Sequence, residues 1–154
     1  MHFLYFEDIE VGASRTKSIV YDIHKEEIMR FAGWWDPRPF HIDEAAASSS
    51  VFGGIVACTA HIFSILSWFG THGEVRTASL AALGFDELRL HHSVRPGDRL
   101  SCTLTCIEKR ESRSKPDRGI VRTRLELSNQ DNVVTFSVIA STLVAKRSCQ
   151  LAYG

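Results

Sequence analysis

The chain has 154 residues, enough for one domain with a substantial core and too few for two ordinary domains. Its 18 basic residues balance its 18 acidic residues, so no bulk charge would attract nucleic acid or an anionic membrane, and neither is an expected partner. No apolar run approaches the roughly 20 residues that cross a bilayer, and the N-terminal stretch lacks the form of a secretory signal. The four cysteines form no CxxC pair, so we expect a reduced protein of the cytoplasm with a single domain over residues 1–154.

The first half of the chain predicts one strand and three helices. Residues 14–23, SRTKSIVYDI, favour a strand. Residues 24–35, HKEEIMRFAGWW, have apolar side chains at the spacing of one helical face, and Asp22 just upstream is a candidate N-cap. Asp43 followed by EAAASSS predicts a second, short capped helix. The run over residues 55–69, IVACTAHIFSILSWF, is apolar nearly all round and flanked by glycines, which predicts a buried helix.

The second half favours strands. The segments with a period of two or many β-branched residues are FDELRLHHSV, RLSCTLTCIEKR, GIVRTRLELSNQ and NVVTFSVIASTLVAKR. The charged stretch 109–119, which contains Ser, Pro and Gly, gives the richest loop signal. One buried helix followed by at least four antiparallel strands indicates an α+β fold, in which a sheet wraps around a central helix. Such a sheet has free edges, which favours pairing with a second copy.

The stretch WWDPRPFHIDEAAASSSVFGG, residues 34–54, holds the candidate site. Its prolines remove backbone donors and disfavour helix in the residues before them, so we expect a stiff, extended loop over the start of the buried helix. Such a loop can hold Asp36 and His41 in fixed relation, and a carboxylate and an imidazole can together grip one water and exchange its protons. The small residues that follow give a ligand close access to the free N–H groups at the start of the buried helix, an oxyanion site in outline.

A longer stretch, FAGWWDPRPFHIDEAAASSSVFGGIVACTAH, resembles the signature of the MaoC-like dehydratases, the (R)-specific enoyl-CoA hydratase branch of the hotdog fold. That pattern runs roughly D-x-N-P-x-H-x-D, then A, then F-G, then I-A-H-G. The matching positions are Asp36, Pro39, His41, Asp43, Phe52, Gly53 and Ala57. The later GFDELRLHHSVRPGDRL is similar to the family's strand and its V-x-x-G-D turn, so the likeness covers most of the chain.

The resemblance implies a hotdog domain, dimers whose sheets join edge to edge, and reversible hydration of trans-2-enoyl-CoA thioesters to (R)-3-hydroxyacyl-CoA. By the family pattern, Asp36 and His41 activate the water, and a backbone N–H near Thr59 binds the thioester oxygen. Coenzyme A is part of the substrate, so we expect no separate cofactor and no metal. The expected partners are an acyl-CoA thioester and a second copy of the chain.

Two positions depart from the family pattern. The family's Asn two residues after the Asp is Arg38 here, a longer, charged side chain that we expect to face solvent or a CoA phosphate. The family's His-Gly pair is Cys58-Thr59, which narrows the space beside the oxyanion donor and keeps its N–H. The residues expected to shape the substrate pocket are Trp34, Trp35, Phe52, Gly53, Gly54, Cys58, Phe63 and Ser67.

The sequence is also compatible with other roles for several residues and with other functions of the protein. Asp36 and His41 would also serve simply to brace the loop, and His61 on the buried helix is expected to be a hydrogen-bonded core histidine rather than a pocket residue. Cys102 and Cys106 share a strand face about 13 Å apart, too far for a disulfide. Two other functions also remain: a thioesterase that directs water at the thioester carbonyl, and a non-catalytic acyl-CoA-binding module.

Overall fold

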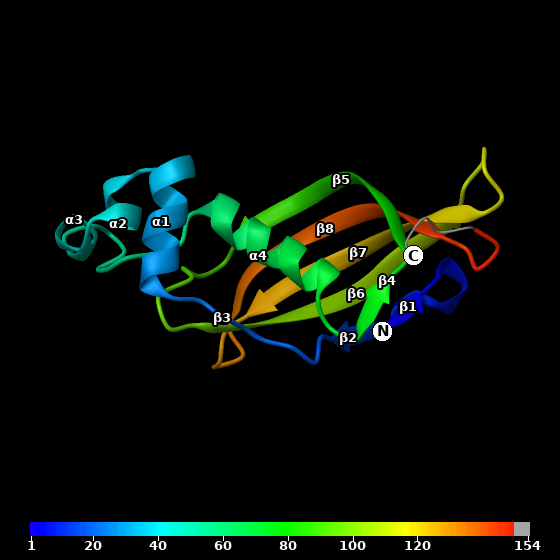
Figure 1. Cartoon of the computed structure of the whole chain (residues 1–154), viewed down its shortest axis with the longest axis horizontal. Coiled ribbons are helices and arrows are strands. Elements are labelled where there is room, and N and C mark those ends of the chain that lie inside the picture. The colour runs from blue at the N-terminus through cyan, green and yellow to red at the C-terminus, as the bar shows by residue number, and fades with distance from the viewer. Residues whose placement is uncertain (150–154) are drawn as a thin grey trace.

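The structure is a computed structural model that describes residues 1–149. It contains a six-stranded antiparallel sheet with one long helix lying across a face of it (Figure 1). The helices are the 3₁₀ turn η1 (Phe6–Asp8), α1 (Lys25–Trp35), α2 (Pro39–Ile42), α3 (Glu44–Ser48) and α4 (Thr59–Thr71). The strands are β1 (His2–Leu4), β2 (Ser14–Thr16), β3 (Tyr21–Asp22), β4 (Val75–Thr77), β5 (Ser79–Leu90), β6 (Arg99–Glu111), β7 (Arg118–Ser128) and β8 (Val134–Ala145).

The sheet has the strand order β2-β6-β7-β8-β5, and the short β3 also pairs with β6. The strand expected over residues 14–23 is therefore two short strands with a break between them. β1 and β4 form a separate parallel pair. Within the described chain β5 pairs in this sheet with β8 alone, so its other edge is free. An antiparallel sheet laid against a central helix confirms the expected α+β hotdog fold.

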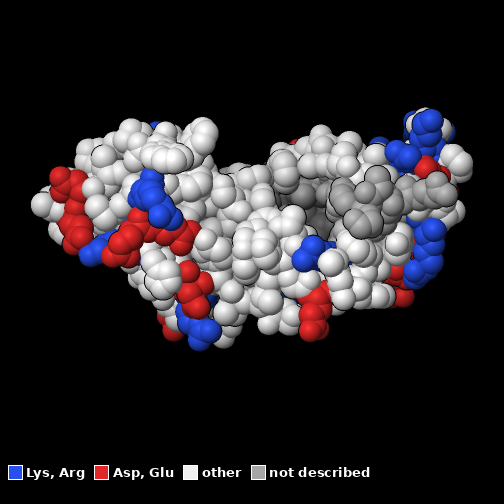
Figure 2. Space-filling view, viewed as in Figure 1, with Lys and Arg blue, Asp and Glu red and all other residues white. Residues whose placement is uncertain are grey.

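Helix α4 carries the main hydrophobic core. Its buried face packs against the inner face of the sheet, and the core includes Ile62, Ile65, Phe69, Leu127 and Phe136. The opposite face is exposed and bears small uncharged residues, and Figure 2 shows an uncharged surface across this part of the molecule. The prediction of a helix that is buried all round was therefore wrong for the isolated chain. No helix of the described chain is long and apolar enough to cross a membrane.

The start of α4 also differs from the prediction. The helix begins at Thr59, and residues 55–58 are buried but not helical. Their N–H groups form hydrogen bonds with other segments of the chain instead of bonds within a helix. The Ala57 N–H donates to the Val94 carbonyl at 2.9 Å, and the Val56 N–H donates to the Phe40 carbonyl at 3.4 Å. These tertiary hydrogen bonds replace the helical bonds that the apolar run alone would favour.

One of the two predicted helix caps is correct. Helix α1 begins after His24, whereas Asp22 lies in β3 and pairs with Arg99 at 2.8 Å, so Asp22 is not the cap. Asp43 is the N-cap of α3, as expected, because its Oδ1 accepts the Ala46 N–H at 2.9 Å.

A second, smaller core, which includes Phe6 of η1, closes the far end of the sheet, where Figure 1 shows β1 and β4. Phe6 of η1 packs there with Val121 of β7 and Val144 of β8. Gly119 of β7 lies directly under the Phe6 ring, and a Cβ at this position would overlap ring atoms. Lys109 Nζ stands 4.6 Å from the centre of the same ring. The N-terminal segment is thus seated on the sheet through one aromatic side chain.

This close contact predicts that Gly119→Ala lowers the free energy of unfolding by about 1–3 kcal/mol, because the methyl group must displace the Phe6 ring. Chemical denaturation measures the change. Gly33→Ala is the matched control: a Cβ at Gly33 meets nothing within 4 Å, and in helix α1 the same change should stabilise by up to about 1 kcal/mol. Equal stability of Gly119→Ala and the wild type would contradict the packing described here.

Candidate active site

Asp36 is held at the end of helix α1. It is the C-cap residue, and its N–H donates to the Ala32 carbonyl at 2.8 Å. Pro37 follows and disfavours helical backbone at Asp36, so the helix stops at Trp35 and the Asp36 side chain leaves the helix axis. This carboxylate is about one quarter exposed, at 28%.

Arg38 binds the same carboxylate. Its Nε lies 3.1 Å from Asp36 Oδ1, although 67% of the Arg38 side chain remains exposed. The expectation that Arg38 faces solvent is therefore correct for most of its length, and the sequence did not indicate the ion pair. The pair occupies Oδ1 of Asp36 and leaves Oδ2 for other partners.

His41 lies on a short helix rather than in an extended loop. Pro39 is the first residue of α2, where proline costs no helical hydrogen bond, so the prediction of an extended segment fails after Arg38. The His41 ring is buried, with 5% of the residue exposed, and packs edge-on against Phe40. Its Nδ1 lies 2.6 Å from the Val56 carbonyl oxygen.

That contact fixes which nitrogen of His41 carries the proton. A carbonyl oxygen only accepts, so Nδ1 donates to Val56, and in the neutral ring Nε2 keeps its lone pair. Nε2 lies 3.7 Å from Asp36 Oδ2, which is too long for a direct hydrogen bond. The structure therefore brings Asp36 and His41 together, each oriented by a separate partner.

A groove lies beside Asp36, and the buried His41 is not among the residues that line it. Its lining residues are Trp35, Asp36, Arg38, Thr59, Ala60, Phe63 and Leu88. Of the residues expected to shape the pocket, Trp35 and Phe63 are in this groove. Leu88 and Ala60 were not anticipated, because no pattern in the sequence connects strand β5 to the stretch around Asp36.

The other expected pocket residues lie outside the groove of the single chain. Trp34 is 81% exposed on α1, Cys58 is buried, and Ser67 is exposed with its hydroxyl donating to the Phe63 carbonyl. Phe52 packs against Phe40, 5.1 Å between ring centres. Gly53 has a positive φ of 65° shortly before the non-helical residues 55–58, and Gly54 lies beside Arg95.

The start of helix α4 faces the groove through Thr59 and Ala60. The N-cap residue Cys58 forms no side-chain cap hydrogen bond. The first N–H groups of a helix have no hydrogen-bond acceptor within the helix, and the Cys58 side chain does not provide one here. Uncapped N–H groups beside the Asp36 carboxylate are suited to an oxygen that gains negative charge.

His61 is a core residue, as expected. Its Nε2 lies 2.8 Å from Glu27 Oε1, and its ring stacks on Phe31 at 4.4 Å between centres. Tyr21 also donates to Glu27 Oε1. The Nδ1 atom of His61 is buried without a hydrogen-bond partner among the described residues. This cluster joins α1 to α4 and so holds Asp36 near the start of α4.

Tyr21 gives the cluster a defined pH dependence. Burial, and then the hydrogen bond to Glu27, raise the pKa of Tyr21 to about 12. Since the folded pKa lies above the unfolded value of about 10, the contribution to stability is complete below pH 10 and is lost as the pH rises toward 12.

We expect the unfolding free energy of Tyr21→Phe to fall less than that of the wild type over this interval, as measured by urea denaturation. Tyr5→Phe is the control and should follow the wild type; parallel curves for all three proteins would refute the assignment.

Comparisons with known proteins find related sequences and structures. A family model described as "MaoC like domain" matches residues 8–129. The uncharacterized protein YdeM of Bacillus subtilis (strain 168) is 30% identical over 136 residues, which are 86% of this chain and 92% of that protein. The crystal structure of a MaoC-like dehydratase from Rhodospirillum rubrum is 33% identical with a TM-score of 0.85, and the match covers 95% of this chain and 99% of that chain.

More distant structures show the fold alone. The R-hydratase PhaJ1 from Pseudomonas aeruginosa, in its unliganded form, is 23% identical with a TM-score of 0.73 over 97% of this chain and 92% of its own. A Mycobacterium tuberculosis protein, Rv0216, described as having a double hotdog fold, is 14% identical with a TM-score of 0.75 over 96% of this chain and 46% of its own. Among the described residues no cluster of His, Cys, Asp and Glu has the arrangement of a metal site.

Proposed function

Since the chain belongs to the MaoC-like dehydratase family, we propose that it is a hydratase that adds water reversibly across the C2=C3 bond of a trans-2-enoyl-CoA thioester. The product is the (R)-3-hydroxyacyl-CoA. The observation that carries the proposal is the separation of 3.7 Å between His41 Nε2 and Oδ2 of Asp36, which lines the groove. This is too long for a direct bond and suited to one water held by both side chains.

The two side chains supply complementary steps. His41 Nε2, with its lone pair, and Asp36 Oδ2 both accept hydrogen bonds from the water, so they can take its proton as the oxygen bonds to C3. The proton is then delivered to C2, which completes the addition without any other reactant. Arg38 orients Asp36 from the other side and keeps Oδ2 directed toward His41.

The intermediate of this addition is an enolate, and its oxygen needs donors. The N–H groups at the start of α4, at Thr59 and Ala60, face the same groove as Asp36. In this proposal they bind the thioester oxygen and stabilise the charge that develops on it. The atoms transferred all come from water, so the reaction requires no cofactor besides the CoA that the substrate carries.

Relatives support the reaction class. The Rhodospirillum rubrum protein, one third identical over nearly the whole of both chains, is described as a MaoC-like dehydratase. The Pseudomonas aeruginosa neighbour is described as an R-hydratase, which accords with the stereochemistry proposed here.

A homodimer is the second part of the proposal. The groove includes Leu88 of β5, which is a free sheet edge within the described residues. Large apolar side chains are exposed on β5 and at the end of α1: Trp34, Trp35, Leu83, Phe85, Leu88 and Leu90. Unpaired backbone groups flanked by exposed apolar side chains are the features that a second strand covers. In this proposal β5 of one protomer pairs with β5 of its partner, and the partner closes the groove.

The activity is tested with purified protein and a panel of short, medium and branched trans-2-enoyl-CoAs. We expect loss of the conjugated enoyl absorbance without release of free thiol, because water adds at C3 and leaves the thioester intact. Release of thiol would indicate a thioesterase instead. Silence in both measurements with every substrate would overturn the hydratase proposal.

The roles of the pair are tested by Asp36→Asn, which keeps the shape of the side chain and removes the base. We expect kcat/KM to fall at least about 100-fold, with unfolding behaviour close to that of the wild type. Asp22→Asn is a matched control, because that carboxylate pairs with Arg99 and is absent from the groove lining; its activity should be unchanged. Near-normal turnover in folded Asp36→Asn would remove the pair from the mechanism.

The dimer is tested by charging the edge strand. Leu83→Lys combined with Leu90→Lys should convert a dimer to a monomer in light scattering and lower activity with it, since the partner closes the groove. Val133→Lys, an exposed apolar position just before β8, is the control and should stay dimeric. A wild-type protein that is monomeric and fully active at assay concentration would contradict this part of the proposal.

A further inference from the structure

A second cavity lies at the opposite end of α4 from the groove. We call it the distal cavity; its volume is about 420 Å³. Its floor is the inner face of the sheet, its walls are the N-terminal segment and the start of β5, and Gly70 of α4 lies at its rim. The apolar residues of the lining include Ile9, Leu104, Val121, Leu125 and Val144. The volume falls within the roughly 300–1,000 Å³ of small-molecule sites.

The cavity exists because the helix is shorter than the strands. Helix α4 and strand β6 both have 13 residues. At the usual rises they are about 20 Å and about 40 Å long, so α4 covers only part of the inner face. The main hydrophobic core lies under α4, and the smaller core lies at the far end of the sheet. The cavity lining includes residues from both: Leu104 and Leu125 pack against the main core, and Val121 and Val144 belong to the smaller one.

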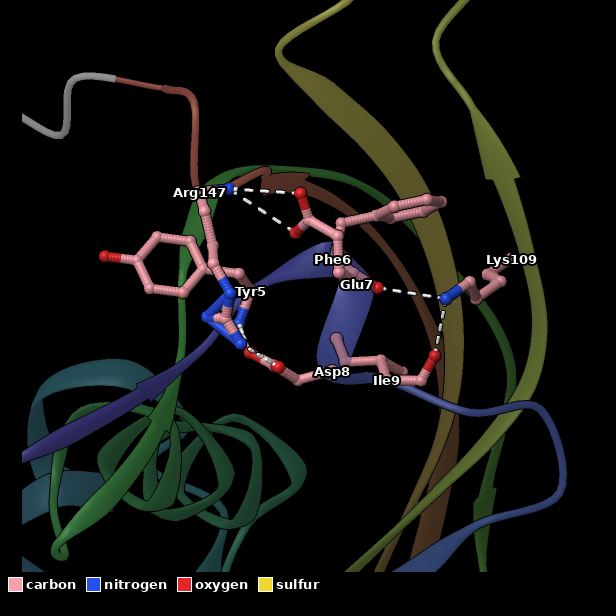
Figure 3. A network of polar contacts seen from close by, with 7 residues as sticks. All are labelled: Tyr5, Phe6, Glu7, Asp8, Ile9, Lys109 and Arg147. Carbon is pink, nitrogen blue, oxygen red and sulfur yellow. Dashed lines mark hydrogen bonds and ion pairs between the residues drawn. The ribbon is translucent and has the colours of Figure 1, made fainter.

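The outer wall is held rigidly. Figure 3 shows Lys109 Nζ beside the carbonyls of Phe6 and Ile9, to which it donates at 3.0 and 2.6 Å. The same view shows Arg147 with its side chain on the Asp8 carboxylate and its N–H on Glu7. Asp8 also accepts the Tyr5 N–H at 2.9 Å. The wall formed by residues 8–10 is therefore fastened to the sheet, and the cavity is preformed.

Arg15 brings a positive charge to this apolar space. On β2 its neighbours Ser14 and Thr16 bond to Thr105 and Thr103 on the outer face of the sheet, so Arg15 lies on the inner face, opposite Leu104. Its Nε is buried without a hydrogen-bond partner, and within residues 1–149 its guanidinium forms no ion pair. Arg15 as a whole is half-buried, and burial lowers the pKa of its guanidinium.

The other charged groups of the lining do not neutralise Arg15. Lys17 donates to the Val75 carbonyl at 2.8 Å, and its own pKa is lowered by burial and then by repulsion from Arg15. Asp8 is bonded to Arg147 and the Tyr5 N–H. Glu10, the remaining carboxylate of the lining, is exposed and makes no ion pair within residues 1–149. The cavity thus combines an unpaired guanidinium with an apolar floor.

We propose that the distal cavity binds a linear aliphatic monocarboxylate of medium chain length. The carboxylate pairs with the Arg15 guanidinium, whose planar donors match two carboxylate oxygens, and the chain lies over Leu104, Leu125 and Val121. A neutral apolar molecule would leave the guanidinium unpaired, and a polyanion would bring charge into an apolar floor. Thr59 and Gly70 are about 16 Å apart along α4, so this site is separate from the groove at Asp36.

Binding is tested with decanoate and decanol, each below its aggregation limit, by titration calorimetry on the intact protein. We expect decanoate to bind and decanol to bind at least about tenfold more weakly. In methyl-labelled protein, decanoate should shift the resonances of Leu104, Leu125, Val121 and Val144 and leave Leu88, in the groove, unchanged. No enoyl-CoA is present, so the result is independent of whether the hydratase proposal holds.

Variants identify the carboxylate partner. Arg15→Gln should weaken decanoate at least about tenfold and leave the weak binding of decanol unchanged. Arg124→Gln is the matched control, because Arg124 is exposed on β7 and follows the cavity residue Thr123, so it points to the opposite face. Thr123→Phe should fill the floor and weaken both ligands.

Three results would overturn the proposal. The first is no binding of decanoate to the wild type. The second is equal affinity for decanoate and decanol with no effect of Arg15→Gln. The third is a methyl shift confined to Leu88, which would place the ligand in the groove. Because the methyl shifts are read on the wild type, failure of a variant to fold would not leave the question open.

Discussion

The architecture depends on a mismatch of length between α4 and the sheet it packs against. An α-helix rises about 1.5 Å per residue and a strand about 3.3 Å, so a helix and a strand of 13 residues differ twofold in length. One helix therefore cannot cover the inner face of this sheet. The chain covers the remainder with different elements at each end: Figure 1 shows α1, α2 and α3 gathered where α4 begins, and β1 and β4 beyond its other end.

Both candidate sites arise at the ends of that helix. At its start, the small helices bring Asp36 and His41 against uncapped N–H groups, and tertiary contacts fix each side chain: Arg38 for Asp36 and the Val56 carbonyl for His41. At its other end, the sheet continues without a helix above it, and the N-terminal segment closes the space as a wall. The candidate catalytic pair thus lies at one end of α4, and a largely apolar cavity that Arg15 and Lys17 help to line lies at the other.

The free edge of β5 connects these local features to assembly. In the single chain the groove beside Asp36 is open, and the aromatic residues Trp34 and Trp35 are largely exposed on α1. Burying such surface is favourable by roughly 25 cal/mol for each Å² of apolar area, which gives a strong reason for a second copy to cover it. A partner on β5 would complete the hydrogen bonding of the edge strand and enclose the proposed reaction away from bulk water.

The amino-acid sequence by itself determined the fold class and identified Asp36 and His41 as a candidate pair, which the structure brings together. Periodicity located the strands β6, β7 and β8, because alternation along a strand directly reflects which face is buried, and Asp43 was identifiable as a cap because capping is local. The end of α1 before Asp36 was also readable, because proline disfavours helical backbone in the residue before it, whereas the short helix that carries His41 was not expected. The sequence did not show where α4 starts, that Asp22 pairs with Arg99, or that Leu88 lines the groove. Each of these depends on backbone or side-chain partners that are distant in the chain.

The tertiary structure alone decided how the site is oriented and where the second cavity lies. Which nitrogen of His41 is free depends on the Val56 carbonyl, and which oxygen of Asp36 is free depends on Arg38; neither relation is encoded in spacing. Likewise, Arg15 Nε becomes buried without a hydrogen-bond partner only when β2 pairs with β6 and Phe6 packs the N-terminal segment onto the sheet. Local pattern sets which face of an element is apolar, whereas the partners of a polar atom are set only by packing between elements.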